Sequence, residues 1–197
     1  MERELRAYSD SLELRKVDEE GKKKQICGYI NKFNTRSQYM GFYEEVSPEA
    51  FNKTLADGHN IYAMYNHDDD KILGSTRSGN LRLLVDDVGL RFELDINENI
   101  SYARDLYELV SNNDVNGCSF GFYVNNDTWS RTDEGIDLRT INEVELIEVT
   151  ITPFPAYLDS EASCRSYDKF KEQQAEELRK AKEQRELELI ELELELI

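Results

Sequence analysis

The chain has no glycine and no proline after Cys164, and the residues that follow are rich in Glu, Lys, Arg, Gln and Leu. Glycine and proline are the residues that most readily end a helix, so their absence favours a helix over this stretch. The sequence therefore predicts an N-terminal segment over 1–25, one folded domain over 26–164 and a charged helical tail over 165–197. With 197 residues and 39% hydrophobic content, the chain is long enough for one domain with a full core.

The tail carries a short apolar pattern of its own. Its last apolar residues include four with a 3-4-3 spacing that a helix would place on one side: Leu187, Ile190, Leu194 and Ile197. The alternation of Leu and Glu from Leu192 onward would also suit a strand. For this composition we favour a solvated, charged helix over an element that packs into the core.

The folded domain is mostly strand-like. The runs KQICGYINKF and LRLLVDDVGLRFELDI show partial alternation of β-branched and aromatic residues, and Asp86–Gly89 inside the second run predicts a hairpin turn. A strand ending at Val124 and the run TINEVELIEVTITPFPAY follow later, and the residues 127–137 between them predict a polar connection.

Two helices interrupt these strands. Ser47 and Pro48 suit the N-cap and first position of a helix that ends at Gly58, and Ser101 suits the N-cap of a second helix with Gly117 beyond its end. The second helix has apolar residues at helical spacing: Ala103, Leu106, Leu109 and Val110. The predicted fold class is α+β and mainly β: a small closed or partly closed β-barrel, or a sandwich, with surrounding helices and the C-terminal charged helical tail.

Charge and cysteine content restrict the partners and the compartment. The formal net charge is −17, and a negative surface repels phosphate backbones and anionic lipid, so we expect no nucleic acid and no membrane as partners. Cys27, Cys118 and Cys164 are too scattered for a disulfide framework or a CxxC metal site, which favours a reducing cytoplasm. The N-terminus lacks the apolar core of a secretion signal, and no apolar run approaches the roughly 18 residues of a membrane span.

The stretch VNGCSFGFYV contains a polar residue where a buried strand would have an apolar one. Ser119 lies between Cys118 and Phe120, with Gly117 and Gly121 two positions away on either side. Glycines keep bulky side chains away and let another backbone approach closely. Ser119 is therefore either a small filler residue or an accessible nucleophile.

A serine hydroxyl is a weak nucleophile until a neighbouring imidazole takes its proton, and the chain contains two histidines. His67 follows the strand-like run IYAMY directly, whereas His59 lies in a connection just after Gly58, so His67 is the better base. A structural histidine is the more common reading of such a residue. A metal site formed by His67 with Asp68–Asp70 is disfavoured, because consecutive residues of an extended chain point to opposite faces and no second histidine lies at ligand spacing.

The blocks YNHDDDKILG, NGCSFGF and LIEVTITPFPAY follow each other in an order that resembles the prohead maturation proteases of tailed bacteriophages. The family also has a proline-initiated helix that ends in Ala-Phe upstream of the histidine, to which Pro48, Ala50 and Phe51 correspond. The resemblance covers roughly residues 26–162. Cys118 and Glu49 depart from the family, which more often has an apolar residue such as Met at the first position and commonly Gly at the second.

The resemblance implies a serine endopeptidase related to the herpesvirus assemblins, whose fold is a β-barrel ringed by helices. The protease domain would then be 26–164, the catalytic residues Ser119, His67 and Glu148, and no cofactor or metal would be required. Members of this family act in the host cytoplasm, inside the assembling prohead. Their partners are the major capsid protein precursor with its scaffolding segment, and further copies of the protease itself.

The third catalytic residue is the most open of these assignments. Assemblins orient the base with a second histidine that follows the nucleophile, and here both histidines precede Ser119. By alternation, Glu148 shares a strand face with Leu146 and Thr150, where a buried carboxylate needs a hydrogen-bonding partner such as a histidine. A Glu148 that faces water on an edge strand remains an alternative, and Asp68 or Asp69 could orient the base instead.

Two other functions remain open from the sequence. One is a cysteine hydrolase that uses Cys118, although adjacent strand residues face opposite ways and Cys118 then belongs to the core. The other is a non-catalytic capsid scaffold or assembly protein, which the acidic body and the Glu-rich tail would suit. For the serine protease we expect Ser119 and His67 to lie at exposed strand ends.

Overall fold

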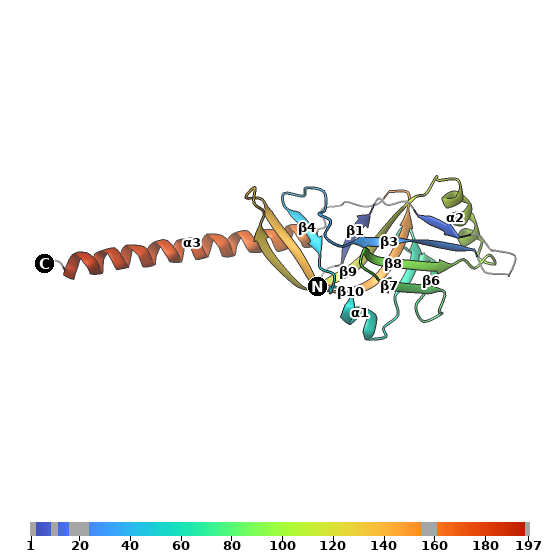
Figure 1. Cartoon of the computed structure of the whole chain (residues 1–197), viewed down its shortest axis with the longest axis horizontal. Helices are drawn as coiled ribbons and strands as arrows, with labels where there is room; N and C mark the ends of the chain where they lie inside the picture. The colour runs from blue at the N-terminus through green and yellow to red at the C-terminus, as the bar shows by residue number, and fades with distance from the viewer. Residues whose placement is uncertain (1–2, 9–11, 16–23, 155–160, 196–197) are drawn as a thin grey trace. The chain divides into compact units, whose positions relative to one another are not determined.

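The computed structural model describes residues 3–8, 12–15, 24–154 and 161–195 (Figure 1). The chain forms two units, Met1–Leu158 and Asp159–Ile197. The first unit is a mixed α+β structure that is mainly β, and the second contains the helix α3 (Glu161–Glu195). Strand-like runs and a helical tail were the main predictions for these two parts of the chain, and both are confirmed.

The larger sheet of the first unit has six strands in the order β1-β9-β10-β5-β6, with β4 paired to β10 as well. Its strands are β1 (Glu4–Tyr8), β4 (Tyr43–Val46), β5 (Tyr62–Tyr65), β6 (Asp68–Ser75), β9 (Gly117–Arg131) and β10 (Asp137–Thr152). β4 and β5 both pair in parallel with β10, β4 near its start and β5 near its end. β10 is therefore an interior strand along both of these stretches.

The smaller sheet has four antiparallel strands in the order β2-β3-β8-β7. They are β2 (Glu13–Arg15), β3 (Gln25–Lys32), β7 (Leu81–Val85) and β8 (Gly89–Asp95). The predicted hairpin turn joins β7 to β8, and the amide of Asp86 donates to the carbonyl of Gly89 at 3.1 Å. The turn prediction is thus confirmed.

The two sheets bury their apolar faces in one shared core. Buried side chains from both sheets belong to a single cluster, among them Ile30, Phe92, Phe120, Phe122 and Leu146. In the described part of the chain neither sheet closes on itself, so the predicted closed barrel is not formed. Packing one apolar face against the other removes both from water without hydrogen-bonded closure, and the sandwich is the better description.

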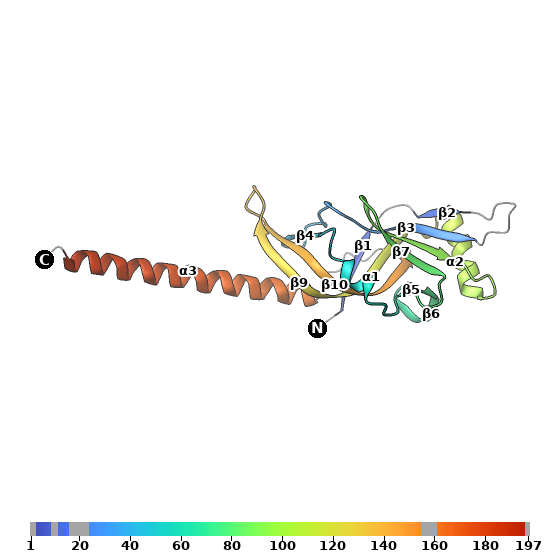
Figure 2. The ribbon, with the colours of Figure 1, turned by 60° about the horizontal axis from the view of Figure 1, so that its bottom comes forward.

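β9 and β10 form one long hairpin, which is plainly visible in Figures 1 and 2. The polar connection predicted over 127–137 is confined to 132–136, because cross-strand pairing continues from Gly117 as far as the pair Arg131 and Asp137. The polar side chains here bond to each other across the strands: the Asn142 amide donates to Asn126 at 3.2 Å. A ladder whose side chains face water needs no apolar alternation, so the sequence pattern did not reveal it.

The helix α1 (Asn52–Ala56) begins later than predicted. Ser47 does not cap it: the carbonyl of Ser47 instead accepts from the amide of Ala50 at 3.0 Å, which forms a turn before the helix. The predicted end is correct, since Gly58 adopts a left-handed φ of 77° just after the helix. Pro48 favours a turn as readily as a first helical position.

The helix α2 (Ser101–Ser111) begins at the predicted serine, but its N-cap is Ile100 and no side chain caps it. Its buried face consists of Ala103, Leu106, Tyr107 and Val110. Tyr107 takes the buried place expected for Leu109, which is partly buried. The left-handed residue after the helix is Asn113 with φ 63°, whereas Gly117 already begins β9.

Most of the side chains that the structure describes within the helix α3 are exposed; Leu187 is 62% exposed. The predicted stripe also includes Ile190, Leu194 and Ile197, whose side chains lie outside the described residues. Among the described helices, none has an apolar stretch of the length that a membrane crossing requires.

Candidate active site

His67 lies in the tight turn between β5 and β6. Tyr65 and Asp68 pair across this hairpin, so Asn66 and His67 are its two central residues, with φ values of 58° and 56°. Positive φ at both central residues is the signature of a type I′ turn, which matches the twist of the flanking strands. The amide of His67 donates to Thr150 Oγ1 at 3.2 Å, so the turn is attached to β10.

Ser119 is the third residue of β9 and lies beside this turn. Its Oγ is 3.0 Å from Nε2 of His67. The residue is fully buried, because β10 pairs with it through Thr150 on one side and β1 pairs with it through Ala7 on the other. The expectation that Ser119 lies at an exposed strand end is wrong, since the N-terminal strand covers the outer edge of β9.

Glu148 contacts the other ring nitrogen of the same histidine. Nδ1 of His67 lies 2.6 Å from Glu148 Oε1, and Thr150 donates its hydroxyl to Oε2 at 2.8 Å. Glu148 is fully buried on the interior strand β10, so it does not face water. The structure therefore brings all three predicted residues together in one hydrogen-bonded series, with the carboxylate on one side of the imidazole and the hydroxyl on the other.

A register shift in the β9–β10 hairpin turns the side chain of Glu148 toward His67. Leu146 pairs with Phe122 and Glu148 pairs with Gly121, so the ladder skips Ile147. Cross-strand partners share a face and neighbours on a strand do not, so the shift places Leu146 and Glu148 on opposite faces. The expectation of one shared face is wrong for this pair, although Glu148 does share its face with Thr150.

Gly121 provides the space that this arrangement needs. A Cβ atom at this position would lie 2.5 Å from Glu148 Oε1 and 2.5 Å from Nε of Arg3. Gly121 therefore clears room for the carboxylate and its neighbours, which is a different role from the approach of another backbone to Ser119.

Arg3 is a neighbour of the site that sequence reasoning missed. Its Nη2 donates to Glu148 Oε1 at 2.6 Å, the same oxygen that faces His67. Arg3 immediately precedes β1, and no local pattern links it to a residue so distant along the chain. The sequence placed Thr150 on the same strand face as Glu148. Its spacing of two residues could also have identified it as a hydrogen-bonding partner of this carboxylate.

His59 has a structural place elsewhere. Its Nε2 is 2.7 Å from the carbonyl oxygen of Leu146 and its Nδ1 is 2.5 Å from Asp57, so both ring nitrogens have partners. Burial lowers the pKa of His59, but the hydrogen bonds to Leu146 and Asp57 outweigh burial and leave the pKa above its ordinary value. The choice of His67 over His59 as the neighbour of Ser119 agrees with these contacts.

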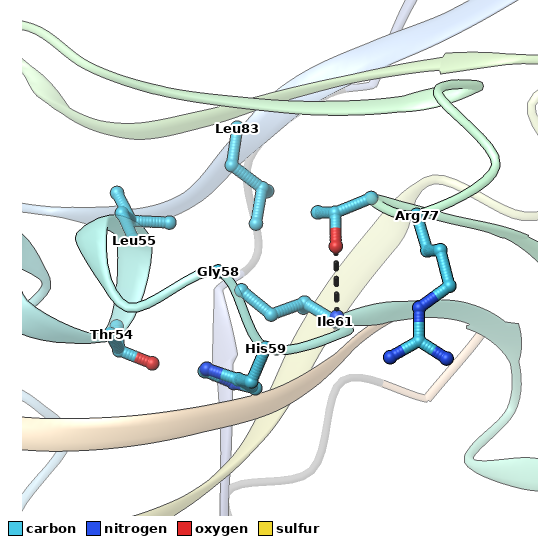
Figure 3. A pocket seen from close by; sticks show the side chains of 8 residues that line it. Thr54, Leu55, Gly58, His59, Ile61, Arg77 and Leu83 are labelled. Carbon is cyan, nitrogen blue, oxygen red and sulfur yellow. Dashed lines mark hydrogen bonds between the residues drawn. The ribbon is translucent and has the colours of Figure 1, made fainter.

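A pocket of about 290 Å³ lies beside His59 (Figure 3). Its lining consists of Thr54, Leu55, Gly58, His59, Ile61, Thr76, Arg77 and Leu83. None of Ser119, His67 and Glu148 lines it, so it is separate from the hydrogen-bonded series.

The alternative acids and the alternative nucleophile lie apart from the imidazole. Asp68 forms an ion pair with Lys71 at 3.3 Å, and Asp69 is exposed. The thiol of Cys118 lies in the apolar core and donates to the carbonyl of Tyr29 at 3.1 Å. Over the residues that the structure describes, no group of three or more His, Cys, Asp and Glu side chains could hold a metal ion.

Comparison with known protein families identifies a family that this chain matches. Residues 10–173 match the protein family described as Caudovirus prohead serine protease. Comparison with curated proteins and with solved structures gave no match. The matched residues include the whole hydrogen-bonded series and the strands that carry it.

Proposed function

The chain belongs to the caudovirus prohead serine proteases, a family of serine endopeptidases of capsid maturation, and we propose that Ser119 is its nucleophile, His67 its general base and Glu148 the group that orients the base. The observation that carries this proposal is the series from Ser119 Oγ to His67 Nε2 at 3.0 Å and from His67 Nδ1 to Glu148 Oε1 at 2.6 Å. Nucleophile, base and orienting group in hydrogen-bond reach of each other form the general arrangement of serine hydrolases.

The proposed reaction has two halves. Ser119 Oγ bonds to the carbonyl carbon of the substrate while His67 Nε2 takes the hydroxyl proton, and His67 then gives this proton to the departing amine as the C–N bond breaks. In the second half His67 takes a proton from water, which attacks the acyl-serine, and returns it to Ser119 as the acid leaves. Glu148 accepts from Nδ1–H and stabilises the imidazolium throughout, and Thr150 holds the other carboxylate oxygen.

We propose the scaffolding segment of the major capsid protein precursor as the substrate, and further copies of the protease itself as a second one. Both would be cleaved inside the assembling prohead in the host cytoplasm. Family membership supports these assignments, because a prohead protease works among the proteins of the immature shell. The tail 165–197 would attach the enzyme to a helical scaffold segment, which suits its long charged helix.

The two other functions have less support. A cysteine hydrolase would need the thiol of Cys118 beside the imidazole, and this thiol instead contacts Tyr29 in the core. A non-catalytic scaffold protein would have no use for a buried Glu148 in contact with a histidine, because burying a carboxylate is costly without a compensating partner.

The test is co-expression of the protease with its cognate capsid precursor. We expect the wild type to cleave the precursor and Ser119→Ala to leave it intact, whereas Cys118→Ala retains cleavage. Ser101→Ala, which removes an exposed hydroxyl at the start of α2, is the matched control and should cleave like the wild type. Cleavage by Ser119→Ala together with loss of cleavage in Cys118→Ala would reverse the assignment of the nucleophile.

A further inference from the structure

The N-terminal strand β1 lies along β9 as an added antiparallel strand. The pairs run from Glu4 opposite Phe122 to Tyr8 opposite Cys118, and Ala7 is the partner of Ser119. The carbonyl oxygen of Arg6 accepts from Ser119 Oγ at 2.6 Å. The peptide bond between Arg6 and Ala7 therefore lies beside the proposed nucleophile, in the extended form in which peptides commonly bind to a sheet edge.

The contact with β1 holds the proposed catalytic groups in an unproductive state. The hydroxyl of Ser119 carries one proton, and while it donates this proton to Arg6 it can only accept from His67. Arg3 adds a second competition, because its guanidinium shares the Glu148 oxygen that faces His67. A bound β1 thus keeps the proton of Ser119 from His67. It also leaves Glu148 less able to stabilise a protonated His67, because Arg3 shares the negative charge of this carboxylate.

The side chain of Arg6 occupies an acidic pocket. Nε and Nη2 of Arg6 donate to the two carboxylate oxygens of Glu44, the second at 2.8 Å, and Nη2 also contacts Glu4 at 2.6 Å. The guanidinium lies 5.7 Å from the ring centroid of Phe122, at cation–π distance. Arg6 is only 6% exposed and Glu44 only 3%, so the pocket encloses a complete basic side chain.

Glu44 is ionised in this pocket. Burial raises the pKa of Glu44, but the charges of Arg6 and Arg139 outweigh burial and hold the pKa below its usual range. A buried carboxylate that is charged selects a cationic partner, because an uncharged side chain would leave the charge without full compensation.

The pocket stays paired when β1 leaves. β1 contributes one cation, Arg6, and one anion, Glu4, so its departure removes no net charge. Glu44 keeps the contact with Nη1 of Arg139 at 3.1 Å, and Arg139 keeps its contact with Asp127 at 2.6 Å. The net stability gained from a buried ion pair is small, because desolvation offsets much of the attraction. β1 is therefore suited to exchange with another strand of the same chemistry.

We propose, on the premise of the proposed function, that the outer edge of β9 is the substrate-binding edge and that β1 occupies it as an internal competitor. In a bound substrate, Glu44 selects an arginine or lysine directly before the cleaved bond. Strand pairing with β9 places the carbonyl of that residue at Ser119, and the pocket with Glu44 and Phe122 reads its side chain. The substrates are extended peptides with a basic residue at this position.

The specificity is tested with quenched fluorescent peptides that contain Glu-Leu-Arg-Ala-Tyr, the sequence of residues 4–8, and variants with Lys, Gln or Glu in place of Arg. We expect cleavage after Arg, and kcat/KM for Arg and Lys roughly ten- to hundredfold above Gln, as a charge-assisted hydrogen bond predicts. Glu44→Gln should remove most of this preference. Glu45→Gln changes the next residue of β4, which contacts Thr140 at 3.2 Å, and should keep it.

The competition by β1 is tested with Arg6→Gln, in which Arg139 still pairs with Glu4 and Glu44. We expect a lower KM for the Arg peptide at an unchanged kcat, and faster labelling of Ser119 by a fluorophosphonate. Arg82→Gln, in a partly exposed ion pair on β7, should match the wild type. Equal KM and equal labelling in Arg6→Gln and wild type would overturn the role of β1.

Denatured casein separates the failure of this inference from that of the proposed function. Cleavage of casein that is lost in Ser119→Ala but shows no preference for Arg or Lys before the cut would overturn the basic-residue pocket and leave the catalytic assignment standing. Cleavage of casein that is equal in Ser119→Ala and wild type would overturn both. Cuts that depend on Ser119 and cluster after Arg and Lys, with the clustering lost in Glu44→Gln, are the expected result.

Discussion

At the scale of single residues, His67 depends on an unusual backbone conformation for its position. Asn66 and His67 both have positive φ, which costs energy in residues other than glycine, and the surrounding contacts hold them there. The amide of Asn66 donates to the carbonyl of Ile151 at 3.0 Å, and its side chain accepts from Thr152 at 2.9 Å. β10 thus carries Glu148 and at the same time fixes the turn that positions His67, the proposed base.

We predict unequal losses from the three proposed catalytic residues. Ser119→Ala and His67→Ala should each lower kcat by roughly 10⁵- to 10⁶-fold, and Glu148→Gln by about 10⁴-fold, because an orienting group contributes less than the nucleophile or the base. Peptide hydrolysis measures the losses, and circular dichroism checks that each variant is folded. An equal or larger loss in Glu148→Gln would contradict the proposed role of this carboxylate.

Gly121→Ala is predicted to damage the site without removing any functional group. The added methyl would lie 2.5 Å from Glu148 Oε1, and Glu148 is held by both His67 and Thr150, so the carboxylate must shift. Misplacement by about 1 Å can cost roughly a hundredfold in rate, and we expect a loss of this size in kcat. Ser130→Ala, at an exposed position of the same strand β9, serves as the control for stability and rate. Wild-type kcat in Gly121→Ala would show that the carboxylate tolerates the shift.

At the scale of elements, the segment around α1 completes the hydrogen bonding of β10. β4 and β5 pair with the two ends of β10, and the backbone between them is satisfied by this segment instead. The amide of Val144 donates to Ala50 at 3.1 Å, the amide of Leu146 donates to Thr54 Oγ1 at 2.9 Å, and the carbonyl of Leu146 faces His59. α1 therefore supports the strand that carries Glu148, although it contributes no residue to the hydrogen-bonded series.

His59 makes this support dependent on pH. Its pKa is raised in the folded protein, so its stabilising contribution is fully present below the unfolded pKa of about 6.5 and is lost as the pH rises through the folded pKa. We predict that the free energy of unfolding of the wild type falls relative to that of His59→Gln as the pH rises above about 6.5. Urea unfolding of both proteins between pH 5.5 and 9 measures this difference. A constant difference over this range would show that folding does not raise the pKa of His59.

At the scale of the whole molecule, the proposed catalytic residues and the helical tail belong to different units of the chain. Residues Met1–Leu158 form one unit and Asp159–Ile197 another, and the proposed catalytic residues all belong to the first. We predict that deletion of 167–197 leaves peptide kcat/KM unchanged but reduces the amount of protease found in assembling shells. Purified proheads from cells that express either form provide the measurement. Equal incorporation of both forms would remove the proposed recruitment role of the tail.

The sequence by itself determined the parts of this protein that depend on a few neighbouring residues. The hairpin turn at Asp86–Gly89, the end of α1 at Gly58 and the helical tail follow from local backbone preferences, which are the same wherever the segment lies. The order of the motifs around His67, Ser119 and Glu148 indicated the family, which the match over residues 10–173 confirms. Their catalytic roles stay a prediction.

Only the tertiary structure decided how strands that are distant in the sequence pair with each other. The register shift at Ile147 turns Glu148 toward His67, and β1 covers Ser119 through a contact between residues 113 positions apart. Whether the sheets stay open as a sandwich or close into a barrel also depends on pairing between distant strands. Pairing and register depend on the contacts of whole strands and on the burial of one face, whereas alternation within a strand specifies only that its two faces differ.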